Sequence, residues 1–413
     1  MLRFCERPSQ RHNGDMSALE VLIAGGGIGG VAAALAAARA GCEVRLYERA
    51  PVFSEVGAGI QLGPNATRVL VQWGLTDGLK AVAAFPEALL VRDAETGGEL
   101  GRLMLGPTMM QRYGAPYATV HRADIHRLLT QALLREDRVH LCLGQAVAGC
   151  GERDDAVTLQ TSLGVKVEGD LLIGADGVWS QVRDQLLHDG APHLTGHLAY
   201  RAMVSTDALP PAARANQVTA WLGPRLHVVQ YPVRGGAWTN LVAIVHGTVP
   251  ANAQDWDHSG NANDLARALG PVCGPLRALI EAVPEASVNP YAWRLWALAG
   301  RTPVQGAQQL ARGRVALLGD AAHPMVPFLA QGAGMAIEDA AELARSLTMD
   351  AVDVPTRLRR YAQARWQRVA RVQARAWRNG QIFHSTGLMR VGRDAGMRLL
   401  GERLLDVPWL YGG

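Results

Sequence analysis

From residue 19 to residue 49, apolar runs are separated by glycines. Residues 19–24 read LEVLIA, an apolar run that predicts a buried β-strand. GGGIGG follows, and the alanine-rich stretch VAAALAAARAG after it predicts a helix that ends at Gly41. EVRLYER, residues 43–49, follows and predicts a second strand that ends at Glu48. This order of strand, glycine turn, helix, strand and acidic residue predicts a unit that binds an adenine dinucleotide.

The glycines and the acidic end of this unit have separate expected roles. Gly25 allows a tight turn, Gly27 lets the backbone approach a pyrophosphate, and Gly30 lets the helix pack closely on the strand. The N–H groups and partial positive charge at the helix N-terminus favour the phosphates. Glu48 is expected to bind a ribose, and Arg49 beside it is assigned to the same cofactor site. The unit alone does not distinguish FAD from NAD.

Two later segments place an acidic residue at the end of an apolar run. DLLIGADGVWSQVR, residues 170–183, predicts a strand, a turn at Asp176 and the start of a helix. RVALLGDAAHPMVPFLAQGAGMAIEDAAELA, residues 314–344, predicts a buried strand that ends at Asp320 and a later helix. An acidic residue at a strand end can bind a ribityl hydroxyl, and a helix N-terminus can stabilise negative charge on a reduced flavin. The residues assigned to that N-terminus are Gly332, Ala333 and Gly334.

In this order, the three motifs resemble those of the class A FAD-dependent aromatic hydroxylases, the p-hydroxybenzoate hydroxylase-like family. The resemblance covers nearly the whole chain from about Met16, and it implies FAD as the bound cofactor. It also implies that Arg122, in TVHRADIHRLL, lies against the flavin, and that GAGIQLGPNA, residues 57–66, forms a loop beside it. Taken singly, Asp176 is more typical of a plain turn and Asp320 of a helix N-cap.

The resemblance implies an activity as well as a cofactor. Members of the family hydroxylate small phenolic acids with NADH or NADPH and O₂, through a flavin C4a-hydroperoxide. The sequence contains no second strand–GxGxxG–helix unit, so we expect the nicotinamide to dock transiently. Three alternatives stay open: the same chemistry on a hydrophobic quinone or polyketide precursor, a flavin-binding protein without activity, and an NAD-dependent dehydrogenase.

Between the second and third motifs, the pattern changes to short runs rich in β-branched and aromatic residues. HLAYRAMVS, QVTAWLG, RLHVVQYPV and WTNLVAIVHG, separated by turn residues, predict an antiparallel sheet. Side chains alternate along a strand, so His227, Val229 and Tyr231 are expected on one face. A single histidine in a strand is more often structural than catalytic.

This region resembles the 3-hydroxybenzoate 6-hydroxylases, with the salicylate hydroxylases as neighbours. The resemblance implies catalytic roles for His227 and Tyr231. A histidine with a pKa near neutral would accept the proton of the ring hydroxyl, and the tyrosine would orient the substrate carboxylate or relay the proton. Pro327 and Phe328 replace a Gln-Tyr pair of the 3-hydroxybenzoate enzymes. The choice between 3-hydroxybenzoate, which would give gentisate, and salicylate therefore stays open.

Together these elements predict an α/β fold with a Rossmann-like FAD-binding domain, an inserted antiparallel-sheet substrate domain and C-terminal helices. The predicted boundaries are 16–85, 115–195 and 300–350 for a discontinuous FAD-binding domain, 86–114 and 196–299 for the substrate domain, and 351–413 for the helical segment.

Composition narrows the choice of partners. A formal net charge of +4 over 413 residues favours anionic ligands but is too small to predict nucleic-acid binding. The apolar run over residues 21–38 is long enough for a membrane span, but its five glycines fit the dinucleotide unit better. The five cysteines include no CxxC pair and predict no metal site. Residues 1–15 do not resemble a signal peptide, so we expect a cytoplasmic protein, and the family's habit suggests a homodimer.

The last sixty residues predict a long helix and a packed tail. Residues 404–413, LLDVPWLYGG, are expected to pack on the core. Arginines recur along one side of the predicted helix, opposite apolar residues, and are expected to form a solvated face. These arginines are Arg357, Arg360, Arg368, Arg371, Arg375 and Arg378.

Overall fold

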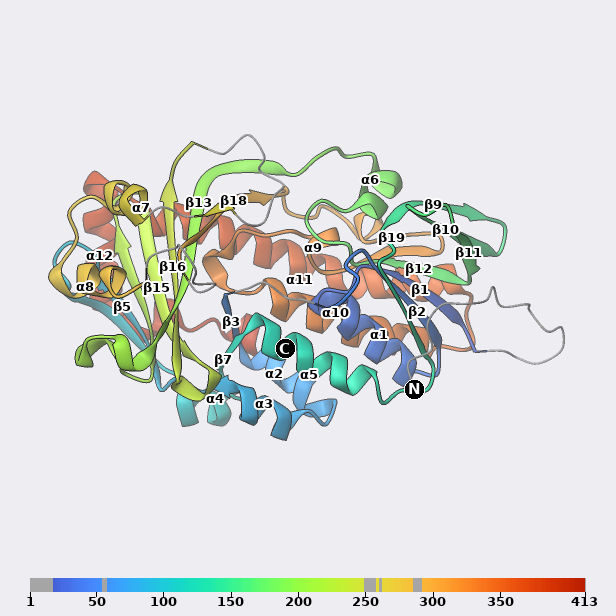
Figure 1. Ribbon diagram of the computed structural model, residues 1–413, viewed down its shortest axis with the longest axis horizontal. Coiled ribbons are helices and arrows are strands. Elements are labelled where there is room, and N and C mark those ends of the chain that lie inside the picture. The colour runs from blue at the N-terminus through green and yellow to red at the C-terminus, as the bar shows by residue number, and fades with distance from the viewer. Residues whose placement is uncertain (1–17, 54–57, 249–257, 260–261, 285–291, 413) are drawn as a thin grey trace.

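The computed structural model describes residues 18–53, 58–248, 258–259, 262–284 and 292–412. It confirms the predicted α/β class. A six-stranded, mainly parallel sheet lies towards one end of the elongated molecule and an eight-stranded sheet towards the other, with a long helix, α11 (Val354–Phe383), running between them (Figure 1). Residues 1–15, which do not resemble a signal peptide, lie outside the described residues.

The six-stranded sheet contains the dinucleotide motif. Its strand order is β19-β20-β12-β1-β2-β8, and every neighbouring pair is parallel except β19 with β20. Helix α1 (Ile28–Arg39) joins β1 to β2, as predicted, and its alanines let it pack closely on the sheet and on α10 (Gly332–Leu347). The strands are β1 (Glu20–Ala24), β2 (Glu43–Glu48), β8 (Val139–Leu143), β12 (Leu171–Gly174), β19 (Ala311–Arg312) and β20 (Val315–Leu317).

The eight-stranded sheet has the order β17-β18-β13-β16-β15-β14-β5-β6. Each of the four apolar runs predicted as strands forms one. The sheet is not purely antiparallel, however, because β5, from an earlier part of the chain, pairs parallel with β14. The strands are β5 (Ala88–Asp93), β6 (Glu99–Met104), β13 (His193–Ser205), β14 (Gln217–Gly223), β15 (Leu226–Val233), β16 (Trp238–His246), β17 (His258–Ser259) and β18 (Arg294–Gly300).

Smaller sheets and shorter helices complete the fold. One small sheet has the order β3-β7-β4, with β3 (Gly59–Leu62), β7 (Ala118–His121) and β4 (Ala83–Ala84). The other has the order β11-β10-β9, with β9 (Val147–Arg153), β10 (Ala156–Thr161) and β11 (Lys166–Gly169). The remaining α-helices are α2 (Pro64–Gln72), α3 (Thr76–Val82), α4 (Gly106–Tyr113), α5 (Arg122–Leu133), α6 (Gln181–Leu187), α7 (Ala262–Leu269), α8 (Gly274–Glu281), α9 (Gly319–Ala322), α12 (Gly387–Leu400), α13 (Glu402–Leu405) and α14 (Pro408–Tyr411).

The predicted solvated arginine face of α11 is wrong in part. Arg357 is buried and donates to the carbonyl oxygen of Leu347 at 2.7 Å. Arg368 pairs with Glu338 of α10, because α11 packs on α10. On a helix packed in this way, arginines donate hydrogen bonds to carbonyl and carboxylate oxygens of the protein instead of to water.

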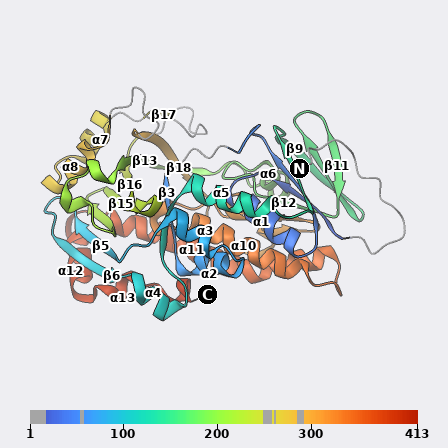
Figure 2. The same cartoon turned by 60° about the horizontal axis from the view of Figure 1, so that its bottom comes forward.

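The C-terminal tail packs on the core, as expected. Leu410 and Tyr411 are buried, and Arg368 donates to the carbonyl oxygens of Trp409 and Leu410. The tail ends beside α2 (Figure 2). In the part of the chain that the structure describes, no helix is both long enough and apolar enough to cross a membrane.

Candidate active site

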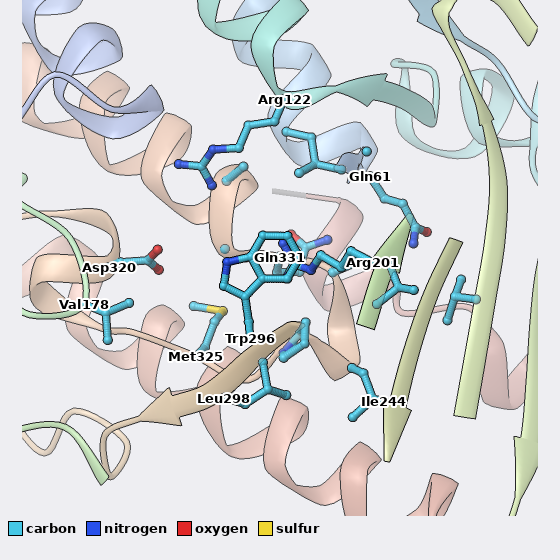
Figure 3. A pocket seen from close by; sticks show the side chains of 18 of the residues that line it. Gln61, Arg122, Val178, Arg201, Ile244, Trp296, Leu298, Asp320, Met325 and Gln331 are labelled. Carbon is cyan, nitrogen blue, oxygen red and sulfur yellow. The ribbon is translucent and has the colours of Figure 1, made fainter. Parts of the chain in front are cut away.

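A pocket lies where β15, β16 and β18 of the eight-stranded sheet face the start of α10 (Figure 3). Residues remote from one another in the sequence line it, so only the tertiary fold brings them together. Gly59 and Gln61 of the predicted flavin-side loop are among them. Six of the predicted site residues line this pocket: Arg122, His227, Tyr231, Asp320, Gly332 and Ala333.

The glycine turn has the close approaches that its sequence predicts. Gly25 has a φ of +100°, and a Cβ there would lie 2.4 Å from the carbonyl oxygen of Ala175. A Cβ at Gly30 would lie 1.9 Å from the carbonyl oxygen of Gly25. Neither position can accept a side chain. At Gly27, by contrast, a Cβ would meet no described atom within 4 Å, and no side chain caps α1. This open helix N-terminus fits a pyrophosphate.

Glu48 stabilises the glycine turn through hydrogen bonds. Its carboxylate accepts hydrogen bonds from the backbone N–H of Gly26 at 2.7 Å and of Ala50 at 2.8 Å. Each oxygen keeps a second lone pair, so Glu48 can still accept a ribose hydroxyl. Arg49, next to it, is exposed and does not line the pocket.

Asp176 lies beside the glycine turn, and its α-carbon would lie 2.8 Å from a Cβ at Gly25. Its carboxylate accepts hydrogen bonds from the backbone N–H groups of Gln181 at 2.8 Å and Val182 at 3.2 Å. Locally it therefore stabilises the start of α6, in agreement with the plainer interpretation. The residues of this segment that line the pocket are Val178 and Trp179.

Asp320 follows β20 and faces the first turn of α10, where its Oδ1 lies 3.9 Å from the Cβ position of Gly332. Burial raises the pKa of Asp320, while the cations of Arg122 and Arg201 oppose that rise. The carboxylate of Asp320 therefore interacts electrostatically with the guanidinium groups of Arg122 and Arg201. Figure 3 shows these three side chains around the pocket. Gly334, the last of the predicted helix-start residues, packs against Ala66 of α2 and not into the pocket.

His227 and Tyr231 share one face of β15 in the pocket, as predicted. His227 is buried, and its Nδ1 shares a hydrogen bond with Nε2 of His384 at 2.8 Å. Burial, assisted by the nearby His197, lowers the pKa of His227 to about 3. The expected pKa near neutral is therefore wrong, because the ring lies away from water and stays uncharged.

The hydroxyl of Tyr231 donates to the carbonyl oxygen of Gly59 at 2.7 Å. Burial raises the pKa of Tyr231. A Cβ at Gly59 would lie 2.7 Å from the Tyr231 ring, so no residue larger than glycine fits there. The hydrogen bond from Tyr231 also holds the Gly59 backbone in place. Tyr231 therefore shapes the pocket wall that includes Gln61.

Sequence reasoning missed Arg201 of β13. Its guanidinium lies over the ring of Trp296, 5.0 Å from the ring centroid, and both residues line the pocket. The Nε atom of Arg201 is buried and has no hydrogen-bond partner among the described residues. The signal in the sequence was a single arginine inside the otherwise apolar run HLAYRAMVS.

Comparison with known proteins identifies the family. The family model described as "FAD binding domain" matches residues 18–376. A 3-hydroxybenzoate 6-hydroxylase of Polaromonas naphthalenivorans is 37% identical over 397 residues, which cover 95% of this chain and 96% of that protein. The chain belongs to the class A FAD-dependent aromatic hydroxylases.

Two further relatives of this hydroxylase carry other substrate names. A 3-amino-4-hydroxybenzoate 2-monooxygenase of Streptomyces platensis is 38% identical over 394 residues, covering 95% of each chain. A 6-hydroxynicotinate 3-monooxygenase of Bordetella bronchiseptica is 38% identical over 357 residues, covering 86% of this chain and 89% of that one.

Solved structures agree with the assignment. Klebsiella pneumoniae HpxO in complex with FAD and uric acid is 27% identical, with a TM-score of 0.81 over 95% of this chain and 96% of that one. A salicylate hydroxylase substrate complex is 26% identical, with a TM-score of 0.80 over 97% of this chain and 96% of that one. The hydroxylase is a flavoprotein monooxygenase that binds FAD.

The start of α10 in the hydroxylase is held by a buried carboxylate that the sequence did not reveal. Asp339 accepts hydrogen bonds from Nε2 of His323 at 2.6 Å, from Nε of Arg365 at 2.7 Å and from the N–H of Gly319 at 3.0 Å. These bonds tie the end of β20 to α10 and α11. Asp339 thereby fixes the helix N-terminus that faces the pocket, whose first N–H groups lack partners within the helix.

Pro327 and Phe328 are the residues that replace the Gln-Tyr pair of the 3-hydroxybenzoate enzymes, and both lie at or next to the pocket. Pro327 lines the pocket, and Phe328 packs behind it with ring centroids 5.2 Å from His227 and 5.5 Å from His384. An aromatic ring here makes the surroundings of His227 more apolar, consistent with its low pKa.

Proposed function

We propose that this hydroxylase adds one hydroxyl group to a six-membered aromatic ring that carries both a carboxylate and a hydroxyl group. Arg201 is the observation that carries the proposal, because it brings a cation with an unpartnered buried Nε into the pocket. A buried guanidinium is costly unless an anion pairs with it. The three relatives named for hydroxybenzoates and a hydroxynicotinate support an anion on a single ring.

FAD, when bound, accepts hydride and activates O₂. Residues suited to hold it are the N-terminus of α1 at Gly27, Glu48 at the ribose end, Asp320, and the N-terminus of α10 at Gly332. The overall reaction balances with NADH or NADPH as a two-electron reductant: one oxygen atom enters the ring and the other leaves as water.

In this arrangement, Arg201 binds the substrate carboxylate and sets the direction of the ring. His227, which is uncharged, accepts a hydrogen bond from the ring hydroxyl and so raises electron density on the carbons that react with an electrophilic oxygen. Tyr231 positions the substrate indirectly, because it holds Gly59 and so shapes the part of the pocket wall that includes Gln61. Apolar side chains such as Val229, Ile244 and Leu298 line the rest of the pocket and exclude water, which limits loss of the oxidant as hydrogen peroxide.

We also propose that the reduced nicotinamide docks only transiently and that the protein forms a homodimer, both carried over from the family resemblance. Light scattering of the purified protein tests the dimer, and comparing NADH with NADPH as reductant tests the choice of nicotinamide.

The substrate is tested by incubating the FAD-loaded protein with O₂, NADH or NADPH, and one ring at a time. The panel contains 3-hydroxybenzoate, salicylate, 3-amino-4-hydroxybenzoate and 6-hydroxynicotinate, with 3-hydroxybenzamide as the matched uncharged ring. Products are separated by chromatography and weighed by mass spectrometry. We expect the ring of at least one acid to gain a hydroxyl group and the amide to react much more slowly. Gentisate from 3-hydroxybenzoate, or catechol together with CO₂ released from the carboxyl group of salicylate, identifies the ring.

Two outcomes contradict the proposal. Equal hydroxylation of the acid and its amide would favour a hydrophobic substrate, since Arg201 would then contribute nothing to selection. Consumption of the nicotinamide with hydrogen peroxide as the sole product for every ring would keep the monooxygenase family but remove this substrate class.

A further inference from the structure

Three histidines come together beside His227 and do not line the pocket. His197 of β13 lies opposite His246 of β16 in the antiparallel register of the two strands. His384, directly after α11, packs against both, with ring centroids 5.2 Å from His197 and 5.1 Å from His246. One ring nitrogen from each of the three residues lies within 4.8 Å of the others.

The remaining ring nitrogens of two of these histidines already have partners outside the cluster. Nδ1 of His197 lies 3.0 Å from Oγ1 of Thr195, and Nε2 of His384 lies 2.8 Å from Nδ1 of His227. Nδ1 of His384 faces Nε2 of His246 at 3.0 Å. Histidines that bind a metal are typically held in this way, with the second nitrogen hydrogen-bonded to a neighbouring residue.

We propose that His197, His246 and His384 form a binding site for a divalent transition-metal ion such as Zn²⁺. Three imidazole ligands suit zinc, copper or nickel, and the absence of a carboxylate among them disfavours Ca²⁺ and Mg²⁺. His246 is exposed, so the ion enters from solvent and water completes the tetrahedral shell. Cysteine spacing predicts no metal site, whereas these three histidines come from separate elements of the fold.

An ion at this site changes the pocket. Metal on Nδ1 of His384 leaves the proton on Nε2, which donates to Nδ1 of His227. His227 then keeps its own proton on Nε2 and offers the pocket a donor in place of an acceptor. This consequence rests on the proposed function: if His227 accepts a hydrogen bond from the ring hydroxyl, Zn²⁺ slows hydroxylation.

The test measures Zn²⁺ binding to the FAD-loaded protein by competition with a chromophoric chelator, independently of activity. We expect one ion per chain, with affinity at least about 100-fold weaker in His246→Gln and His197→Gln. Thr195→Val removes only the partner of His197 and weakens binding about 10-fold, within the 10- to 100-fold range usual for such partners. His193→Gln, an exposed histidine on the same strand, is the matched control and binds like the parent. Flavin absorbance and circular dichroism verify that each variant is folded.

Failure of the parent to compete for Zn²⁺, or unchanged binding in His246→Gln, overturns the site. Activity is measured separately: Zn²⁺ should inhibit hydroxylation by the parent and by His193→Gln at the concentration at which it binds. If Zn²⁺ binds as described but no ring in the panel is hydroxylated, the metal site stands and the proposed function fails.

Discussion

The guanidinium of Arg201 lies over the indole ring of Trp296, 5.0 Å from the ring centroid, at the wall of the pocket. The indole ring holds the cation in place without neutralising it. Replacing Arg201 with Gln should therefore raise KM for an acid substrate about 10- to 150-fold, the loss expected for a charge-assisted hydrogen bond worth about 1.5–3 kcal/mol. KM for the amide analogue should change much less.

Arg92 offers the matched control, because it also lies over an indole ring, that of Trp221, in the same sheet but outside the pocket. Arg92→Gln should leave KM for the acid unchanged. Equal increases of KM in both variants would mean that a general disturbance of the sheet, and not carboxylate binding, explains the effect.

A substitution at Gly27 is expected to weaken FAD binding without affecting the stability of the fold. Since a Cβ at Gly27 meets no described protein atom within 4 Å, Gly27→Ala should leave the free energy of unfolding of the apoprotein nearly unchanged. If a pyrophosphate approaches this backbone, the same change should weaken FAD binding at least about 10-fold, measured by flavin fluorescence. Gly151→Ala, another glycine with open space around it, is the control. Full FAD affinity in Gly27→Ala would place the pyrophosphate elsewhere.

Tyr231 should act by position and not by titration. Its raised pKa keeps the phenol protonated throughout the working pH range. Tyr231→Phe loses the hydrogen bond to Gly59, worth about 0.5–1.5 kcal/mol, and should lower kcat/KM about 2- to 12-fold with an unchanged pH profile. Tyr113→Phe removes a hydroxyl bound to Asp406, outside the pocket, and serves as control. A shifted pH profile in Tyr231→Phe would show that the phenol transfers a proton.

Asp339 should contribute strongly to stability. Asp339→Asn weakens the charge-assisted hydrogen bonds to Asp339, while Arg365 keeps Glu338 as a partner, and it should cost about 1.5–3 kcal/mol in the free energy of unfolding at pH 7. Glu342→Gln, which breaks a surface pair with Arg345, should cost at most about 1 kcal/mol. Urea unfolding of the FAD-loaded proteins measures both.

The pH dependence of the Asp339 effect has a fixed sign. Its partners hold the pKa of Asp339 below the usual value of about 3.9 for an aspartate in the unfolded chain. The stabilisation is therefore complete above pH 3.9 and is lost as the pH falls towards the lower folded-state pKa. The difference between the parent and Asp339→Asn should be constant from pH 7 to pH 5 and shrink below pH 4. A difference that grows on acidification would contradict this assignment.

By itself, the sequence determined the elements whose geometry follows from neighbouring residues. Gly25 and Gly30 predicted the turn between β1 and α1, because backbone conformation and close approach there exclude a Cβ. The start of α10 at Gly332 and the shared face of His227 and Tyr231 followed from helix and strand periodicity. These features depend on chain geometry over a few residues, so one sequence is enough.

Tertiary structure decided what depends on residues far apart in the chain. The parallel pairing of β5 with β14, the three hydrogen bonds to Asp339 and the burial that lowers the pKa of His227 all join segments that no local pattern connects. Arg201 shows the difference most clearly. The sequence displays one arginine in an apolar strand, but only the fold brings Trp296 and the pocket to its guanidinium, since packing and desolvation depend on every element around a side chain.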